Sequence, residues 1–292
     1  MSLSPAPFPF HHRLRVRWVE VDAQQVVFNG HYLMYVDTAV TEYWRTVGLP
    51  FPEGLAHFGG EVLVRRNELE YHAPARQDDW LDVAIRCDRM GRTSMTFAWQ
   101  IRSGGRLLVS GETVYVMTDL ATRKPMAVPD AVRTQIEAHA RCQPVHVVQL
   151  GDWSSLCSGA QAVRRAVFIE EQAIPESEEW DDEDATACHA LVSNLAGLPL
   201  ATARLITHGL APGHAKIGRM AVIRSSRGVG LGERLLHALI DEARRQRITQ
   251  LSLHAQTSAQ GFYARAGFVP EGDEFDEVGI PHVMMQMALT AP

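Results

Sequence analysis

Three glycines at alternate positions, Gly228, Gly230 and Gly232, place the tightest constraint on the fold of this chain of 292 residues. They lie between a strand-like run at residues 217–223 and a helix-like run at residues 231–247. Glycines in such a connection let the backbone approach an anion, and the N–H groups at the helix start point towards it along the helix dipole. The segment therefore predicts a phosphate-binding loop or a tight turn without a ligand, and by itself it does not decide between them.

The residues around these glycines disfavour two common nucleotide-binding loops. No Lys-Ser or Lys-Thr follows the glycines, as a Walker loop requires. No acidic residue ends a second strand at the spacing of a dinucleotide-binding fold. We therefore expect a phosphorylated cofactor other than a nucleoside triphosphate or a nicotinamide.

Further segments match a known family in the right order. Arg227, Gly230 and Gly232 fit the pattern Gln/Arg-x-x-Gly-x-Gly/Ala, and residues 216–222 and 262–268 agree with the same family before and after the loop. Over residues 145–289 the chain thus resembles the Gcn5-related N-acetyltransferases (GNAT). Similarity to their small bacterial ElaA-like branch is carried by residues 167–172, 179–181, 201–205 and 279–282.

The resemblance implies that acetyl-CoA is the cofactor and that an amine accepts the acetyl group. It also implies that the pyrophosphate lies on the amides of the loop, while the pantetheine arm follows the strand before it. The residues implied for cofactor binding are Met220, Ala221, Val222, Arg227, Gly228, Val229, Gly230, Leu231, Gly232 and Glu233.

Tyr263 matches the family position of the acid that protonates the departing thiolate. The pKa of a phenol lies close enough to that of a thiol for this proton transfer. The alternative role is that of a core tyrosine bonded to a carbonyl group. Spacing does not rank the candidates for the general base, which are Glu170, Glu171, Glu179, Asp182 and His189.

Seven of the nine residues in the segment 176–184 are acidic. Such a density of carboxylates attracts cations, so the segment could collect an amine at the mouth of the acceptor site. A solvated acidic loop explains the same composition without any ligand. The sequence leaves both interpretations open.

The first half carries a second signature, in residues 17–22 and 26–33. Asp22, Asn29 and Tyr32 occupy the places of an Asp that closes the first strand and of an Asn-x-x-Tyr where a helix begins. This pattern resembles the hot-dog fold thioesterases of the 4-hydroxybenzoyl-CoA and YbgC type. The resemblance implies hydrolysis of acyl-CoA thioesters.

Thioester hydrolysis needs a carboxylate to attack or to activate water, and amide dipoles to hold the oxyanion. By the resemblance, Asp22 is the nucleophile or general base, and the backbone N–H groups of Phe28 and Asn29 are the oxyanion donors. Without the resemblance, Asp22 is an ordinary turn or capping residue. Many relatives have glycine where this chain has Gln25, so a position that needs a glycine conformation would give the loop a different geometry here.

Hydrophobic periodicity over residues 10–140 favours an α+β domain with one helix against an antiparallel sheet. The helix is expected from Gly30 to about residue 48. Its apolar stripe is expected to be core and consists of Tyr32, Tyr35, Val36, Ala39, Val40, Tyr43 and Val47. Strands are expected at residues 61–71, 80–88, 94–102 and 106–119, with a short helix from Pro129.

The length fits two domains, and a strand expected at residues 145–150 places the boundary between residues 143 and 144. We predict a hot-dog domain at residues 1–143 and a GNAT domain of mixed α/β fold at residues 144–292. Because hot-dog domains cover a sheet edge by pairing, we also expect a homodimer or a larger homo-oligomer.

Composition excludes several classes of function. A net charge of −6 without a long Lys/Arg tract argues against binding to nucleic acid or to an anionic membrane. The four cysteines and the scattered histidines show no metal-ligand spacing, so we expect no metal. With no signal peptide and no apolar run of membrane-spanning length, a cytoplasmic location is expected.

The two resemblances together imply a bifunctional CoA-thioester enzyme, an acyl-CoA thioesterase fused to an N-acyltransferase. Hydrolysis of acetyl-CoA by the first half would destroy the donor of the second, so the thioesterase is expected to prefer a longer or aromatic acyl chain. One alternative makes the hot-dog half a non-catalytic dimerisation or acyl-binding module. Another makes the GNAT half a regulator that senses CoA.

Overall fold

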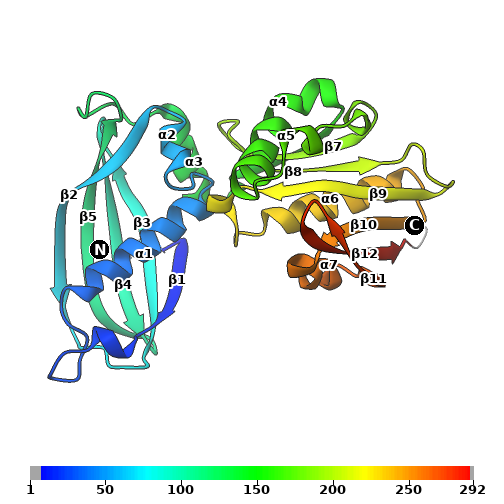
Figure 1. Ribbon diagram of the computed structural model, residues 1–292. Helices are drawn as coiled ribbons and strands as arrows, with labels where there is room; N and C mark the ends of the chain where they lie inside the picture. The colour runs from blue at the N-terminus through cyan, green and yellow to red at the C-terminus, as the bar shows by residue number, and fades with distance from the viewer. Residues whose placement is uncertain (1–7, 290–292) are drawn as a thin grey trace. The chain divides into compact units, whose positions relative to one another are not determined.

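The computed structural model describes residues 8–289, and the chain divides into two compact units, residues 1–145 and 146–292. Each unit has its own sheet and its own hydrophobic core (Figure 1). Both are mixed α and β structures, as the sequence predicts.

The first unit contains one long helix and a five-stranded antiparallel sheet of strand order β1-β3-β4-β5-β2. Helix α1 runs along one face of this sheet (Figure 1). The elements are β1 (Phe10–Arg15), the 3-10 turn η1 (Trp18–Glu20), α1 (His31–Thr46), α2 (Glu53–Ala56), β2 (Gly60–Tyr71), β3 (Trp80–Met90), β4 (Ser94–Ser103), β5 (Arg106–Asp119) and α3 (Asp130–Ala140).

The apolar stripe of α1 is buried along its whole length, which confirms the helical period of the sequence. It packs on inward-facing residues of β3 and β4, among them Ile85, Phe97 and Trp99. Tyr43 near the C-terminal end of the stripe meets Phe97 edge to face, with ring centroids 5.3 Å apart. One helix therefore closes the core of this unit against a single sheet.

The second unit is built on a seven-stranded sheet of order β11-β12-β10-β9-β8-β7-β6. Helices α4 and α6 cover β7, β8 and β9 from opposite faces (Figure 1). The strands and main helices are β6 (His146–Gly151), α4 (Trp153–Arg164), α5 (Glu176–Glu179), β7 (Cys188–Asn194), β8 (Pro199–Ile206), β9 (His214–Val222), α6 (Leu231–Arg245), β10 (Gln250–Gln256), α7 (Gln260–Arg265), β11 (Val269–Glu277) and β12 (Ile280–Ala288). The short elements are the π-helical turn η2 (Arg165–Glu171) and the 3-10 turns η3 (Asp182–Ala185), η4 (Arg224–Ser226) and η5 (Thr257–Ala259).

Strands β9 and β10 are the parallel pair of this sheet, and they are hydrogen-bonded to each other only in their first halves. Pairing runs from Gln250 with His214 to Leu253 with Ile217 and then stops. Beyond that point β9 remains paired with β8 on its other side, through a bulge at which Arg219 adopts a positive φ of 50°. The two strands thus separate, and residues 218–222 of β9 keep an unpaired edge towards β10.

Candidate active sites

The glycine loop of the second unit lies between η4 and α6, as the sequence predicts. Gly228 and Gly230 have φ angles of 88° and 80°, which other residues adopt only with strain. A Cβ atom at either position would meet nothing within 4 Å, so open space lies beside the loop. No hydrogen bond within residues 8–289 takes up the N–H groups of residues 229–233. The loop therefore presents free amide donors at a helix N-terminus, which suits an anion.

The side chain of Arg227 fixes the start of this loop. Its Nε donates to Val222 O at 3.1 Å, and its two terminal nitrogens donate to the Glu171 carboxylate at 2.8 and 2.7 Å. The hydrogen bond from Arg227 lowers the pKa of Glu171, so this carboxyl group stays ionised. Arg227 was predicted to bind the cofactor, and here its guanidinium instead joins the loop to η2.

Tyr263 on α7 points towards the separated part of β9. Its hydroxyl donates to Met220 Sδ at 3.5 Å, and its ring packs edge to face on Phe262 with centroids 4.9 Å apart. Burial raises the pKa of Tyr263 to about 12, so the phenol holds its proton at neutral pH. The hydroxyl makes no bond to a carbonyl among the described residues, and it is therefore available as an acid.

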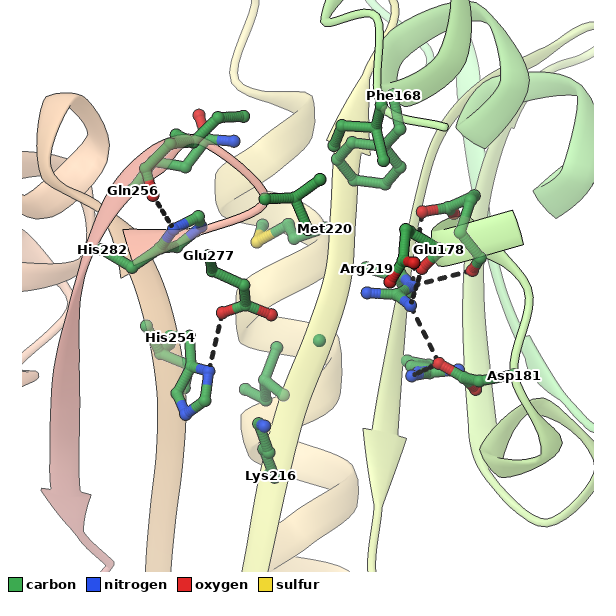
Figure 2. A pocket seen from close by; sticks show the side chains of 18 of the residues that line it. Phe168, Glu178, Asp181, Lys216, Arg219, Met220, His254, Gln256, Glu277 and His282 are labelled. Atoms are coloured by element: carbon green, nitrogen blue, oxygen red, sulfur yellow. Dashed lines mark hydrogen bonds and ion pairs between the residues drawn. The ribbon is translucent and has the colours of Figure 1, made fainter. Parts of the chain in front are cut away.

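A cavity of about 470 Å³ opens where β9 and β10 separate (Figure 2). Met220 and Tyr263 lie on its wall, and so does Glu179. The other four sequence candidates for the general base, Glu170, Glu171, Asp182 and His189, do not line it. His189 is buried, and its Nε2 lies 2.9 Å from Asp184 O.

Two side chains that the sequence analysis did not consider meet inside this cavity. His254 on β10 and Glu277 on β11 form a pair with Nδ1 and Oε2 2.9 Å apart (Figure 2). His282 on β12 lies on the same wall. His254 and Glu277 are 23 residues apart, and the β10-β12-β11 order brings their strands together. The residues of β10 alternate between its two faces, which places His254 and Gln256 on the same face. This alternation was the feature of the sequence that could have indicated His254 as a site residue.

The acidic segment 176–184 is exposed in part, and two of its carboxylates lie in a buried ion-pair network. Glu179 and Asp184 are buried, and Arg164, itself buried, binds both of them. Burial raises the pKa of Glu179 although Arg164 opposes this. Arg204 binds Asp184 from the other side at 2.7 Å. Further ion pairs of the segment join Arg204 to Asp181 and Glu183, Arg219 to Asp181 and Glu179, and Arg165 to Glu176.

The structure corrects the position of Asp22 in the first unit. Strand β1 ends at Arg15, and Asp22 follows η1 in a loop instead of closing a strand. The Gln24 N–H donates to Asp22 Oδ1 at 2.8 Å, which is the turn role open to an Asp at this point. The Asp22 N–H donates to Val26 O at 2.9 Å. Asp22 nevertheless lines a cavity, together with Gln25, Trp18, Val19, Val21, Arg76 and Gln77.

The predicted oxyanion donors fit only in part. The N–H of Phe28 donates to Glu20 O at 3.0 Å and is therefore occupied, which corrects its assignment. The N–H of Asn29 has no hydrogen bond within residues 8–289 and lies just before α1. Neither Phe28 nor Asn29 lines the cavity beside Asp22.

Gln25 resolves the question raised by the missing glycine. Its φ is 61°, in the left-handed region that glycine adopts without strain. Its N–H donates to Asp22 O at 2.9 Å and closes the turn. Gln25 therefore adopts the glycine-like conformation itself.

Comparison with known proteins assigns each unit separately. The family model "Acetyltransferase (GNAT) domain" matches residues 167–289, and the model "Thioesterase superfamily" matches residues 24–110. Over 125 residues the chain is 37% identical to a Bacillus subtilis (strain 168) protein named "Putative acetyltransferase". That alignment covers 42% of this chain and 83% of the relative.

The first unit has relatives of its own. Over 132 residues the chain is 30% identical to the acyl-CoA thioester hydrolase YbgC of Escherichia coli O157:H7, covering 42% of this chain and 92% of the relative. A Thermus thermophilus thioesterase solved with coenzyme A and zinc is 27% identical, with a TM-score of 0.41, covering 47% of this chain and 98% of that one. No helix within residues 8–289 has the length and apolar character that a membrane crossing requires.

Proposed function

Because this chain belongs to the thioesterase superfamily through its first unit and to the GNAT acetyltransferases through its second, we propose that it is a bifunctional CoA-thioester enzyme. The first domain, residues 1–143, hydrolyses an acyl-CoA. The second domain, residues 144–292, transfers the acetyl group of acetyl-CoA to a small amine.

One observation carries the transferase half: the free amides of the glycine loop and the unpaired edge of β9 lie next to each other along the chain. The amides of residues 229–233 suit the pyrophosphate, and the edge at residues 218–222 suits the pantetheine. Met220, at the middle of that edge, touches the Tyr263 hydroxyl, which gives the departing sulfur a proton. Arg227 positions the loop through Glu171.

The hydrolase half rests on Asp22. This carboxylate lies on the wall of a cavity in the loop that precedes α1, with its backbone held by the turn at Gln25. Asp22 attacks the thioester carbonyl or activates water. The donor proposed for the oxyanion is the free N–H of Asn29, which lies before α1 and outside the lining of this cavity in the single chain. Trp18 and Val19 next to Asp22 are exposed apolar side chains, which suits a long or aromatic acyl group.

We further propose that the protein is a homodimer or a larger homo-oligomer assembled through the hot-dog domain. Strand β2 is an edge strand of 12 residues, and Leu63 and Val64 on it are about half exposed. A long edge strand with exposed apolar side chains offers a surface for pairing, and a second copy would cover it.

A pair of variants tests both activities in one purified protein, each variant serving as the other's control. Asp22→Asn removes the nucleophilic carboxylate and is expected to lower thiol release from long and aromatic acyl-CoAs at least about 100-fold, with acetyl transfer intact. Tyr263→Phe removes only the phenol hydroxyl and is expected to lower acetyl transfer about 10- to 100-fold, with hydrolysis intact. Hydrolysis is measured as the thiol released from a long or aromatic acyl-CoA without an amine. Acetyl transfer is measured as the amine-dependent release of CoA from acetyl-CoA.

Three results would contradict parts of this proposal. Undiminished hydrolysis by Asp22→Asn would reject the role of Asp22. Tight acyl-CoA binding without turnover by the parent would favour a non-catalytic hot-dog module, for which the turn bond from Gln24 to Asp22 is the best structural support. CoA binding by the second unit without transfer to any amine would instead favour a CoA-sensing regulator.

A further inference from the structure

We infer that His254, held by Glu277, is the general base that deprotonates the acceptor amine in the second unit. This inference rests on the proposed acetyl transfer. It assigns the one role in that reaction which the sequence analysis left without a residue.

The geometry places a proton acceptor on the cavity wall. One ring nitrogen of His254, Nδ1, is paired with Glu277 at 2.9 Å, and the other, Nε2, has no hydrogen bond within residues 8–289 (Figure 2). A carboxylate at Nδ1 fixes the tautomer that carries the proton there, so the lone pair of Nε2 is free to accept one. Phe275 packs edge to face on the imidazole, with ring centroids 5.0 Å apart, and restrains its orientation.

Four other titratable groups on the cavity wall are less suited to this task. Glu179 is 2% exposed and bound to Arg164 and Arg219, so it cannot receive a proton without breaking a buried ion pair. Nδ1 of His282 is 2.8 Å from Ile280 O, which leaves it without a carboxylate partner. Lys216 on β9 is cationic, and Tyr263 on α7 is required as the acid.

The location also suits a cationic acceptor. The carboxylates that line the cavity are Glu178, Glu179, Asp181, Glu183 and Glu277, and the cationic side chains are Arg204, Lys216 and Arg219. Carboxylates are in the majority, and Glu277 differs from Glu179, Asp181 and Glu183 because its partner is His254 and not an arginine. An ammonium group entering the cavity therefore meets negative charge on the His254 side.

The proton and electron movements balance with the groups named. The substrate ammonium gives one proton to His254 Nε2, and the freed nitrogen lone pair forms the C–N bond to the thioester carbonyl. The C–S bond then breaks with its electron pair on sulfur, which takes the proton of Tyr263. The new amide nitrogen loses its surplus proton, which restores the phenol, and His254 releases its own proton to solvent.

The test compares His254→Gln and Glu277→Gln with the parent, using acetyl-CoA and a fixed set of primary amines: spermidine, ethanolamine, glucosamine and lysine. At pH 7 we expect His254→Gln to lower kcat about 100-fold with the KM for acetyl-CoA unchanged within about twofold. Glu277→Gln is expected to lower kcat about 10-fold, because His254 remains. The matched control is His237→Gln, at an exposed position on α6, which is expected to leave every parameter unchanged.

The pH profile separates a base from a structural residue. As pH rises towards the pKa of the free amine, the substrate loses its proton to solvent, so the deficit of His254→Gln should shrink. A deficit that is constant with pH, or a rate equal to the parent's, would overturn the assignment of His254. If the parent itself transfers acetyl to none of these amines while it binds acetyl-CoA, the proposed transferase activity fails instead.

Discussion

Gln25 shows how a single residue can keep a loop whose usual glycine is missing. Its backbone lies in the left-handed region at φ 61°, and its N–H closes the turn on Asp22 O. A residue with a Cβ adopts this conformation at a cost of about 1–2 kcal/mol. The loop that carries Asp22 is thus retained against a local strain, and Gln25 itself becomes part of the cavity wall.

Replacing Gln25 by glycine should therefore stabilise the first unit. Relief of the left-handed strain exceeds the extra backbone entropy that glycine loses on folding, and we expect a net gain of about 0.5–1 kcal/mol in the free energy of unfolding. The measurement is the urea midpoint of the full chain, read from the protection of α1 amides after a brief hydrogen-exchange pulse.

Gln24→Gly is the matched control for this change. Gln24 has no positive φ, so glycine there brings only the entropic cost and should destabilise the same unit by about 0.5–1 kcal/mol. Equal effects of the two variants would show that the conformation of Gln25 carries no strain.

Asp22 and Gln25 also mark the limit of what the sequence could predict at this scale. The motif pointed to the loop that we propose to be functional, but not to the turn bond from Gln24 or the occupied N–H of Phe28. Hydrogen bonds of this kind depend on the path of the backbone between two elements, and residue spacing does not encode that path.

The absence of a metal, expected from the spacing of cysteines and histidines, stays a prediction.

Among the elements, the connection from β1 to α1 is held by a buried carboxylate. Glu20, only 3% exposed, accepts hydrogen bonds from the Arg17 N–H and the Tyr35 hydroxyl, each at 2.7 Å, and its carbonyl holds Phe28. Burial by itself would raise the pKa of Glu20, but the hydrogen bonds from Arg17 and Tyr35 outweigh it and lower the pKa.

A lowered carboxyl pKa gives this connection a pH dependence. Glu20 contributes stability that is fully present above its unfolded pKa, near 4.5, and is lost as pH falls through the lower folded value. We expect Glu20→Gln to destabilise the first unit by roughly 1–3 kcal/mol at pH 7, and the difference from the parent to shrink below about pH 4.5. The same exchange pulse on α1, applied after equilibration in urea at pH 7 and at pH 4, measures both values.

Glu70→Gln provides the comparison, because Glu70 is an exposed carboxylate on β2. It should change the stability by less than about 0.5 kcal/mol at either pH. A Glu20→Gln deficit that is as large at pH 4 as at pH 7 would refute the electrostatic explanation.

The elements themselves were largely predictable, whereas the contacts among their ends were not. Hydrophobic periodicity located α1 and the strands from β2 to β5, because burial imposes a fixed period on each element. It also predicted that the glycine loop lies between strand β9 and helix α6. The cavity pair of His254 and Glu277 was missed, since it depends on β12 lying between β10 and β11. The ion pairs of Arg164 with Glu179 and Asp184 were missed because they join α4 to α5 and η3, and composition alone left a solvated loop and a cation-collecting segment both open.

At the scale of the whole molecule, each unit has an edge strand on which two neighbouring apolar side chains are exposed in a single chain. In the first unit this edge is β2, where Leu63 is 47% and Val64 is 53% exposed. In the second it is β6, where Val147 and Val148 are exposed to a similar degree. The β2 edge is twice as long, with 12 residues against 6, so it offers a larger surface for pairing with a second copy.

We therefore expect self-association to depend on β2 and not on β6. Light scattering of the parent should give at least twice the chain mass, and the double variant Leu63→Lys, Val64→Lys should shift it to the single-chain mass at micromolar concentration, because like charges then meet across the paired edges. The matched variant Val147→Lys, Val148→Lys carries the same added charge and should keep the parent's mass. If the β6 variant dissociates and the β2 variant does not, the assembly uses the acetyltransferase unit, and the hot-dog domain is not the source of the oligomer.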